Sequence, residues 1–367
     1  MTHRSFDLHA ILGEELKPYG TTDYRRLTCA AVAAVEGSLV AKPSNKKLEN
    51  VEWADAGGVV GMRPMGDEST IAQVHPRKLC DALVAGAKAL AGASVVEGCA
   101  AGLRENADGV VDGLLLADGS CLDADAVVVC MGPWSHALGR PKTEKMGLIG
   151  DEGYSGWGLA GLPPVVGTKY HAVLLQAPRV LSQAVFFQGY GDPEVYPRPD
   201  GETYVTGSPD AADIVRDLPG ETPVREEVCT KLINSMNALS TELKDAPVNH
   251  KQACHLPSAI DGVPVVGEIK PGAYPFQRLR LIRSAPRRGE MSRRRRGCKL
   301  DLLRTGRVAA GARRGSRRYA GFGHGCWGIL LGPATGEALA NLICTDSSPT
   351  LDLRRFDPKR FAGKFAA

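Results

Sequence analysis

The chain has 367 residues, 43% of them hydrophobic, and a formal net charge of +4. This length predicts two domains with a sizeable core. No stretch approaches the roughly 18 consecutive apolar residues of a membrane-spanning helix. The ten cysteines form no C-x-x-C pair and no cluster with histidine. They therefore argue against disulfides and a metal site, and they favour reduced thiols in the cytoplasm.

Two helices are expected in the first quarter of the chain. An amphipathic helix is predicted near residues 5–18. A second helix is predicted to begin at Gln73-Val74-His75-Pro76 and to continue to about Ala91, because proline suits the first helical turn and apolar residues follow at helical spacing. Strands are expected after it, with a hairpin turn at Ala117-Asp118-Gly119. The predicted strands are 94–97, 109–116 and 126–131.

Antiparallel strands are expected in the second half of the chain. Residues 171–176, 184–188 and 203–207 alternate in polarity or are continuously apolar, as strands do. Tyr196-Pro197-Arg198-Pro199-Asp200-Gly201 fits a hairpin turn between two of them. A helix over 225–239 is predicted to follow.

A strongly basic stretch covers residues 275–319. It holds fifteen Arg and one Lys against one Glu and one Asp, a net charge of +14, so the rest of the chain carries −10. A nucleic-acid or acidic-membrane patch is one interpretation, although no aromatic residues are interleaved. A translated intron or frameshifted segment is the other. Both predict a disordered or weakly structured insert.

The most informative stretch is Gly323 to Gly336, Gly-His-Gly-Cys-Trp-Gly-Ile-Leu-Leu-Gly-Pro-Ala-Thr-Gly. Its glycines introduce an apolar run with helical spacing. A glycine-rich turn that opens a helix leaves backbone N–H groups unpaired and directs the positive end of the helix dipole at one point. Such a point suits a phosphate, or a ring that gains negative charge during turnover. A plain turn before a helix is the alternative.

Four other motifs precede this stretch in the chain. They are 73–76, 127–135, 196–201 and the Asp-Gly-Val-Pro-Val-Val-Gly segment at 261–267. In this order the five motifs resemble FAD-dependent oxidoreductases of the D-amino-acid oxidase and sarcosine oxidase superfamily. The resemblance is strongest to an uncharacterised branch of FAD oxidoreductases in fungi and protists, whose members share T-A-Q-V-H-P, Y-P-R-P-D-G and G-H-x-C-W-G-I-L.

The resemblance implies a mixed α/β fold with two domains. An interleaved, Rossmann-like FAD-binding domain is expected beside a substrate domain built on an antiparallel sheet. The FAD-binding domain would take residues 1–20, 72–157 and 320–345, the substrate domain 21–71 and 158–274, the insert 275–319 and the tail 346–367. In this family Tyr274 would run directly into Gly321, so the two ends of the insert should lie close together.

The family begins with a βαβ unit that carries the G-x-G-x-x-G fingerprint. This chain instead begins at the helix that follows that unit, and the early glycines Gly57, Gly58 and Gly61 have the wrong spacing. We therefore expect the first βαβ unit to be missing and the purified chain as given not to hold FAD, which leaves its activity open.

The resemblance implies which residues contact FAD. Gly323, Gly325 and Gly328 would let the backbone approach the isoalloxazine edge, because glycine has no Cβ. His324 is expected beside the ring face as the catalytic residue, and a hydrogen-bonded structural histidine is the alternative. Thr335, in the same motif, is expected to contact the cofactor.

Two further cofactor contacts come from other motifs. Gly132 ends the strand that contacts the cofactor in this family. Cys254 lies seven residues before Asp261, the spacing at which sarcosine and pipecolate oxidases with covalent flavin place the attached thiol. A small packing residue is the alternative for Cys254. Arg198 and Tyr196 are visible candidates for binding a substrate carboxylate, although turn residues are usually solvated.

The implied reaction moves a hydride from a C–H bond beside an amine to flavin N5, with a small amine or amino acid as substrate. A flavin-less paralogue that serves as a binding or trafficking partner is the main alternative. A basic protein associated with nucleic acid is the weaker one. The sequence indicates neither the substrate nor the electron acceptor.

Overall fold

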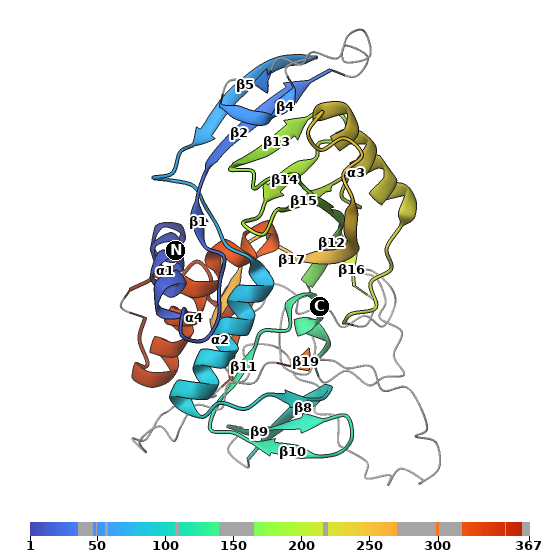
Figure 1. Ribbon diagram of the computed structural model, residues 1–367. Helices are drawn as coiled ribbons and strands as arrows, with labels where there is room; N and C mark the ends of the chain where they lie inside the picture. The colour runs from blue at the N-terminus through green and yellow to red at the C-terminus, as the bar shows by residue number, and fades with distance from the viewer. Residues whose placement is uncertain are drawn as a thin grey trace.

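The protein has a mixed α/β fold with several sheets (Figure 1). The computed structural model describes residues 1–35, 47–48, 50–55, 58–106, 110–138, 165–215, 219–269, 299–300, 318–348 and 350–361. Helices in these ranges are α1 (Thr2–Glu15), α2 (Pro76–Ala91), α3 (Glu226–Leu239) and α4 (Gly328–Thr345), with short 3₁₀ helices η1 (Gly132–Ala137), η2 (Gly325–Trp327) and η3 (Pro358–Phe361).

The largest sheet has eight strands in the order β16-β12-β15-β14-β13-β2-β5, with β17 also paired to β12. Its neighbouring strands are antiparallel except β13 and β2, which are parallel. The strands are β2 (Thr28–Ala34), β5 (Val59–Gly66), β12 (Val165–Gln176), β13 (Gln183–Gln188), β14 (Glu194–Pro197), β15 (Glu202–Gly207), β16 (Asp213–Ile214) and β17 (Val248–Ala259). The sheet therefore joins two segments that are far apart in the chain.

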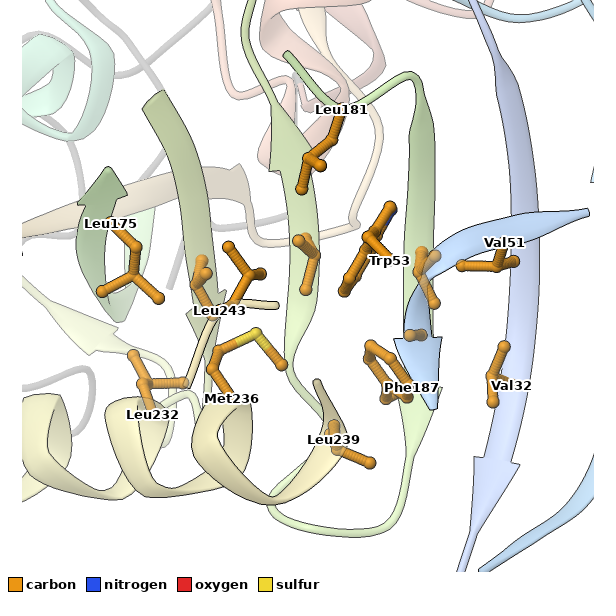
Figure 2. Close-up of a cluster of buried hydrophobic side chains, with 14 of the residues drawn as sticks. Val32, Val51, Trp53, Leu175, Leu181, Phe187, Leu232, Met236, Leu239 and Leu243 are labelled. Carbon is orange, nitrogen blue, oxygen red and sulfur yellow. The ribbon is translucent and has the colours of Figure 1, made fainter. Parts of the chain in front are cut away.

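One face of this sheet is buried against α3 and β4 (Val51–Asp55), as Figure 2 shows. Successive strand residues point to opposite faces, so every second residue enters this core. Leu232 and Met236 stand four residues apart on one side of α3 and are fully buried. The Trp53 ring of β4 meets Phe187 edge-on, with centroids 6.1 Å apart. This packing leaves the opposite face of the sheet for other contacts.

A smaller sheet has the order β11-β20-β18, with β11 parallel and β18 antiparallel to β20. Its strands are β11 (Val127–Val129), β18 (Val265–Glu268) and β20 (Arg318–Phe322). Helix α4 follows β20, and α1 lies along α4 (Figure 1). Ala334 N–H donates to Ser5 Oγ at 3.1 Å, and Arg4 forms an ion pair with Glu337. Segments from near both ends of the chain thus pack together.

Smaller sheets complete the described fold. An antiparallel sheet consists of β10 (Cys121–Asp123), β9 (Val111–Leu116) and β8 (Ala100–Glu105), and the two-stranded sheets pair β1 (Arg25–Arg26) with β6 (Ala72–Gln73), β3 (Lys47–Leu48) with β4, and β7 (Val96–Glu97) with β19 (Lys299–Leu300). The buried side chain of Arg318 in β20 forms an ion pair with Glu105 at 2.9 Å. That pair ties the β8 sheet to the β11-β20-β18 sheet.

Local sequence determines the ends of α2, and the predicted helix is confirmed. It begins at Pro76, and His75 Nδ1 accepts a hydrogen bond from Lys78 N–H at 3.5 Å. Gly92 ends the helix with φ 64°, a left-handed conformation that favours glycine. The predicted hairpin turns also occur, at 117–119 between β9 and β10 and at 198–201 between β14 and β15.

The structure corrects the expected boundaries of the basic insert. Arg318 and Tyr319 belong to β20, because both pair with β11. Both are buried, and the charge of Arg318 is paired with Glu105. Lys299–Leu300 pairs with β7, so these two residues also have a strand partner. Tyr274 and the rest of 270–317 lie outside the described residues. Ile269 N–H donates to Arg318 O at 2.8 Å, so the described chain on either side of the insert lies side by side.

A second correction concerns β18. Strand β18 lies within residues 158–274, the range expected for the substrate domain. It nevertheless pairs with β20 in the sheet that leads to α4. The chain therefore leaves the large sheet at Ala259, where β17 ends. Among the described residues, no helix is both long and apolar enough to cross a membrane. Nor do three His, Cys, Asp or Glu side chains in those ranges form a group that could hold a metal ion.

Candidate functional site

The chain turns sharply where β20 ends. Gly323 has φ 78° and Gly325 has φ 57°, a left-handed conformation that glycine adopts at little cost. A Cβ on Gly323 would lie 3.1 Å from Ala259 N, and a Cβ on Gly325 would lie 3.3 Å from Ser258 Oγ. Both glycines are therefore required by backbone conformation and by the close approach of β17.

Gly328 differs from the other two glycines. Its φ is −58°, and a Cβ there would make only an ordinary contact, 3.8 Å from His324 Cβ. Gly323, Gly325 and Gly328 nevertheless have the spacing G-x-G-x-x-G, and they join a strand to a helix. No described strand follows α4, however, so the βαβ unit that gives this spacing its meaning as a dinucleotide fingerprint is not present here.

The N-terminus of α4 is electrostatically uncompensated. Its N-cap residue, Trp327, gives no side-chain capping bond, and the first turn holds no acidic residue. The Trp327 side chain is 61% exposed. The positive end of the helix dipole therefore faces this turn without a capping or acidic side chain in the first turn, and it suits an electron-rich group placed there.

His324 sits between this turn and α4. Its ring nitrogen Nε2 lies 3.0 Å from Oγ1 of Thr335, which stands in α4 eleven residues further along the chain. His324 also forms a β-bridge with Ser258 of β17. Burial lowers the pKa of His324 to about 4, so the imidazole is neutral near neutral pH. Two predicted site residues are thus in direct contact, and the hydroxyl of Thr335 is used to orient His324.

Gly132 meets the same end of β17 from another strand. It follows β11 with φ 54°, and its Cβ position lies 4.0 Å from Pro257 Cγ. Gly321 in β20 stands beside Cys130, because a Cβ on Gly321 would lie 3.2 Å from Cys130 Sγ. The ends of β11 and β20 and the end of β17 therefore converge around the glycine turn.

Cys254 lies farther along β17, opposite Tyr170 of β12. It is four residues from Ser258 and so on the same face of the strand, at a distance of about 13 Å along it. Although the residue is exposed, desolvation raises the pKa of its thiol. A raised pKa keeps the thiol protonated at neutral pH, which disfavours the thiolate that a thioether bond requires.

Tyr196 and Arg198 are placed differently from the solvated turn residues that were expected. The Arg198 side chain is only 12% exposed and forms an ion pair with Glu202 at 3.1 Å. Its guanidinium lies 5.3 Å from the ring centroid of Tyr204. The charge of Arg198 is thus already compensated. Tyr196 OH donates to Glu194 Oε2 at 2.6 Å.

Three residues on the free face of the large sheet, Tyr170, Glu194 and Tyr204, were not predicted from the sequence. They come from β12, β14 and β15, and only strand pairing brings them together. The signal in the sequence was alternation within each strand, which places Glu194 and Tyr196 on the face opposite the buried Val195. That alternation does not show which strands are neighbours.

The family to which the chain belongs follows from comparison with known proteins. The profile of the family described as "FAD dependent oxidoreductase" matches residues 3–342. A protein of Schizosaccharomyces pombe named "Putative oxidoreductase C1F5.03c" is 25% identical over 381 residues, which cover 97% of this chain and 80% of that protein. The chain is therefore an oxidoreductase of the FAD-dependent family.

Solved structures show the same fold. Glycine oxidase from Geobacillus kaustophilus superposes with a TM-score of 0.61 at 19% identity, covering 96% of this chain and 80% of that one. Iminodiacetate oxidase from Chelativorans sp. BNC1 superposes with a TM-score of 0.62 at 16% identity, covering 97% and 82%. The mixed α/β fold and the family predicted from the sequence are thus confirmed.

Proposed function

We propose that the turn between β20 and α4 binds the flavin ring of FAD, even without the expected first βαβ unit that would hold the adenosine half, and that the family's reaction at this site is the oxidation of an amine or an amino acid. The observation that carries the proposal is the turn itself. Its two left-handed glycines, Gly323 and Gly325, face β17 and lead into a helix whose N-terminus has no side-chain cap. Bound FAD would supply at N5 the acceptor for a hydride from the C–H bond beside the substrate amine.

The residues of the turn would hold the ring and stabilise negative charge on it. The positive end of the α4 dipole favours an electron-rich edge, and glycine lets the backbone approach that edge closely. Gly132 would contact the cofactor from the end of β11. Cys254 would contact it from β17 as a neutral thiol. The FAD-binding and substrate domains would meet at this convergence of strands, in the interleaved arrangement expected from the sequence.

His324 would act beside the ring as a neutral hydrogen-bonding group. Its neutral state follows from the pKa of about 4 that burial produces. Its orientation follows from the 3.0 Å contact with Thr335. A neutral imidazole adds no positive charge beside a substrate amine, so it does not oppose the cationic product of hydride loss.

Small amine or amino-acid substrates are proposed because the fold neighbours are named for glycine and iminodiacetate oxidation. We also propose that the protein is located in the cytoplasm. The nine described cysteines are free thiols, in keeping with a reducing compartment.

The proposal is tested by titrating the purified chain with FAD and with riboflavin, which has the ring without the adenosine half. Flavin fluorescence reports binding. Gly325→Val should weaken binding of both ligands by about tenfold or more, because the side chain is strained at φ 57° and is directed at Ser258. Gly220→Val, at a glycine with φ 82° and nothing within 4 Å of its Cβ, controls for backbone strain alone. Absence of binding to the wild type, or equal binding by both variants, would refute the proposal.

A further inference from the structure

Glu194 is a carboxylate on the free face of the large sheet. It stands in β14 opposite Thr206 of β15 and Phe186 of β13. The next residue, Val195, is fully buried in the core beneath α3. Because neighbouring strand residues point to opposite faces, Glu194 points away from that core. It shares its face with Tyr196, which is two residues along.

No cation neutralises this carboxylate within the described parts of the chain. Glu194 accepts one hydrogen bond, from Tyr196 OH at 2.6 Å, and forms no ion pair with a described Lys or Arg. Glu202, on the next strand, is paired with Arg198. A half-buried carboxylate without a cation costs free energy that evolution normally offsets with a partner. Among the described residues, the carboxylate of Glu194 is therefore open to a cationic ligand.

Aromatic side chains lie near Glu194 on this face of the sheet, beginning with its hydrogen-bond partner Tyr196. Tyr196 meets Phe186 edge-on with centroids 5.6 Å apart, and Tyr196 and Tyr204 are 6.1 Å apart. Aromatic faces attract cations, by about 0.5–2 kcal/mol for each well-placed contact. A carboxylate among such rings is the combination that recognises an ammonium or guanidinium group.

Strand register places Glu194 on the same face of the large sheet as Tyr170 of β12 and Cys254 of β17. Burial raises the pKa of Tyr170, and the negative charge of Glu194 raises it further. Burial likewise raises the pKa of Cys326 in η2, again with a contribution from Glu194. The carboxylate of Glu194 thus shares one face of the sheet with residues that lead toward the turn proposed for the flavin ring. Tyr170 in turn pairs with Cys254, the cofactor contact proposed on β17.

We propose that Glu194 binds a positively charged group of the substrate that is distinct from the amine being oxidised. The inference rests on the proposed function. Hydride leaves a carbon beside a neutral amine, whose lone pair stabilises the cation that forms. An ion pair with Glu194 on that same nitrogen would keep it protonated and oppose the step. The substrate class is therefore a diamine or a basic amino acid.

The test compares pairs of ligands that differ by one ammonium group. The pairs are 1,4-diaminobutane with butylamine, and ornithine with norvaline, each titrated into the full chain by calorimetry with FAD present. The charged member of each pair should bind about tenfold more tightly, as a charge-assisted hydrogen bond with partial exposure provides. Glu194→Gln should abolish that preference and leave binding of butylamine and norvaline unchanged.

Two variants serve as controls. Tyr196→Phe removes the hydrogen bond and keeps the carboxylate, so the preference should persist. Glu221→Gln removes one negative charge from an exposed residue just before α3, and it should change neither ligand. Equal binding within each pair by the wild type, or an undiminished preference in Glu194→Gln, would overturn the inference.

The experiment also separates this inference from the proposed function. Flavin binding is measured first on the wild type and on Glu194→Gln, by the fluorescence titration described above. Flavin binding without any preference for the charged ligands would refute the role of Glu194 alone. Ligand preference without flavin binding would refute the flavin site and leave Glu194 as a cation-binding residue.

Discussion

Acidification should destabilise this protein through His324. The unfolded imidazole has a pKa of 6.5, whereas burial lowers the pKa in the folded protein to about 4. Between these values the unfolded state binds more protons than the folded state, so the free energy of unfolding falls as the pH falls. The contribution of His324 is fully present above pH 6.5 and is lost once the pH is below about 4.

The size of the effect follows from the two pKa values. Each pKa unit corresponds to about 1.4 kcal/mol, so the difference sets an upper bound of about 3 kcal/mol. His324 is half-buried, and solvent screening of the imidazolium reduces this figure. We therefore expect the neutral histidine to stabilise the fold at pH 7 by about 1 to 2 kcal/mol relative to pH 4.

The measurement compares urea unfolding of the wild type and His324→Gln across this pH range. Glutamine is neutral throughout and can accept a hydrogen bond from Thr335, so it removes only the titration. His9, His75 and His171 also have lowered pKa values, mainly through burial. They titrate in both proteins, so the difference between the two stability curves isolates His324. Parallel curves from pH 7 to pH 4 would refute the reasoning.

Two further substitutions test the turn and the thiol. Gly323→Ala should lower the free energy of unfolding by about 1 to 2 kcal/mol, because φ is 78° and the new Cβ would lie 3.1 Å from Ala259 N. Gly332→Ala is the control, since nothing lies within 4 Å of its Cβ position and a helix prefers alanine; equal thermal stability of the two variants would contradict the strain argument. Acid-precipitated wild-type protein loaded with FAD should release its flavin, because the raised pKa of Cys254 disfavours a thioether. Yellow wild-type protein alongside colourless Cys254→Ser would instead establish the covalent bond.

Features set by a few adjacent residues could be predicted from the sequence. Helix α2 begins at Pro76, and the turns at 117–119 and 198–201 occur where glycine and proline place them. The turn before α4 was found for the same reason. A left-handed backbone, a fixed proline φ and a helix start each depend on one to four residues. Such features can therefore be predicted without knowledge of the rest of the fold.

Strand β17 could not be predicted from its own residues. Its twelve residues include Asn249, His250, Lys251 and Gln252, and its first residues are exposed. They lack the alternation that marks a half-buried strand, so no strand was predicted there. Hydrogen bonding to β12 over most of its length makes the segment a strand. The parallel pairing of β13 with β2 likewise joins segments some 150 residues apart in the chain, without any signal in either.

The candidate site divides in the same way. The sequence by itself determined the glycine turn, His324 and the membership of an FAD-dependent family, because a motif is contiguous. Only the tertiary structure decided that His324 contacts Thr335, that Arg198 is already paired, and that Glu194 has no cation partner among the described residues. These partners depend on strand register, and a shift of one residue would move each side chain to the opposite face of the sheet. The charge that a substrate meets is therefore a property of the assembled sheet.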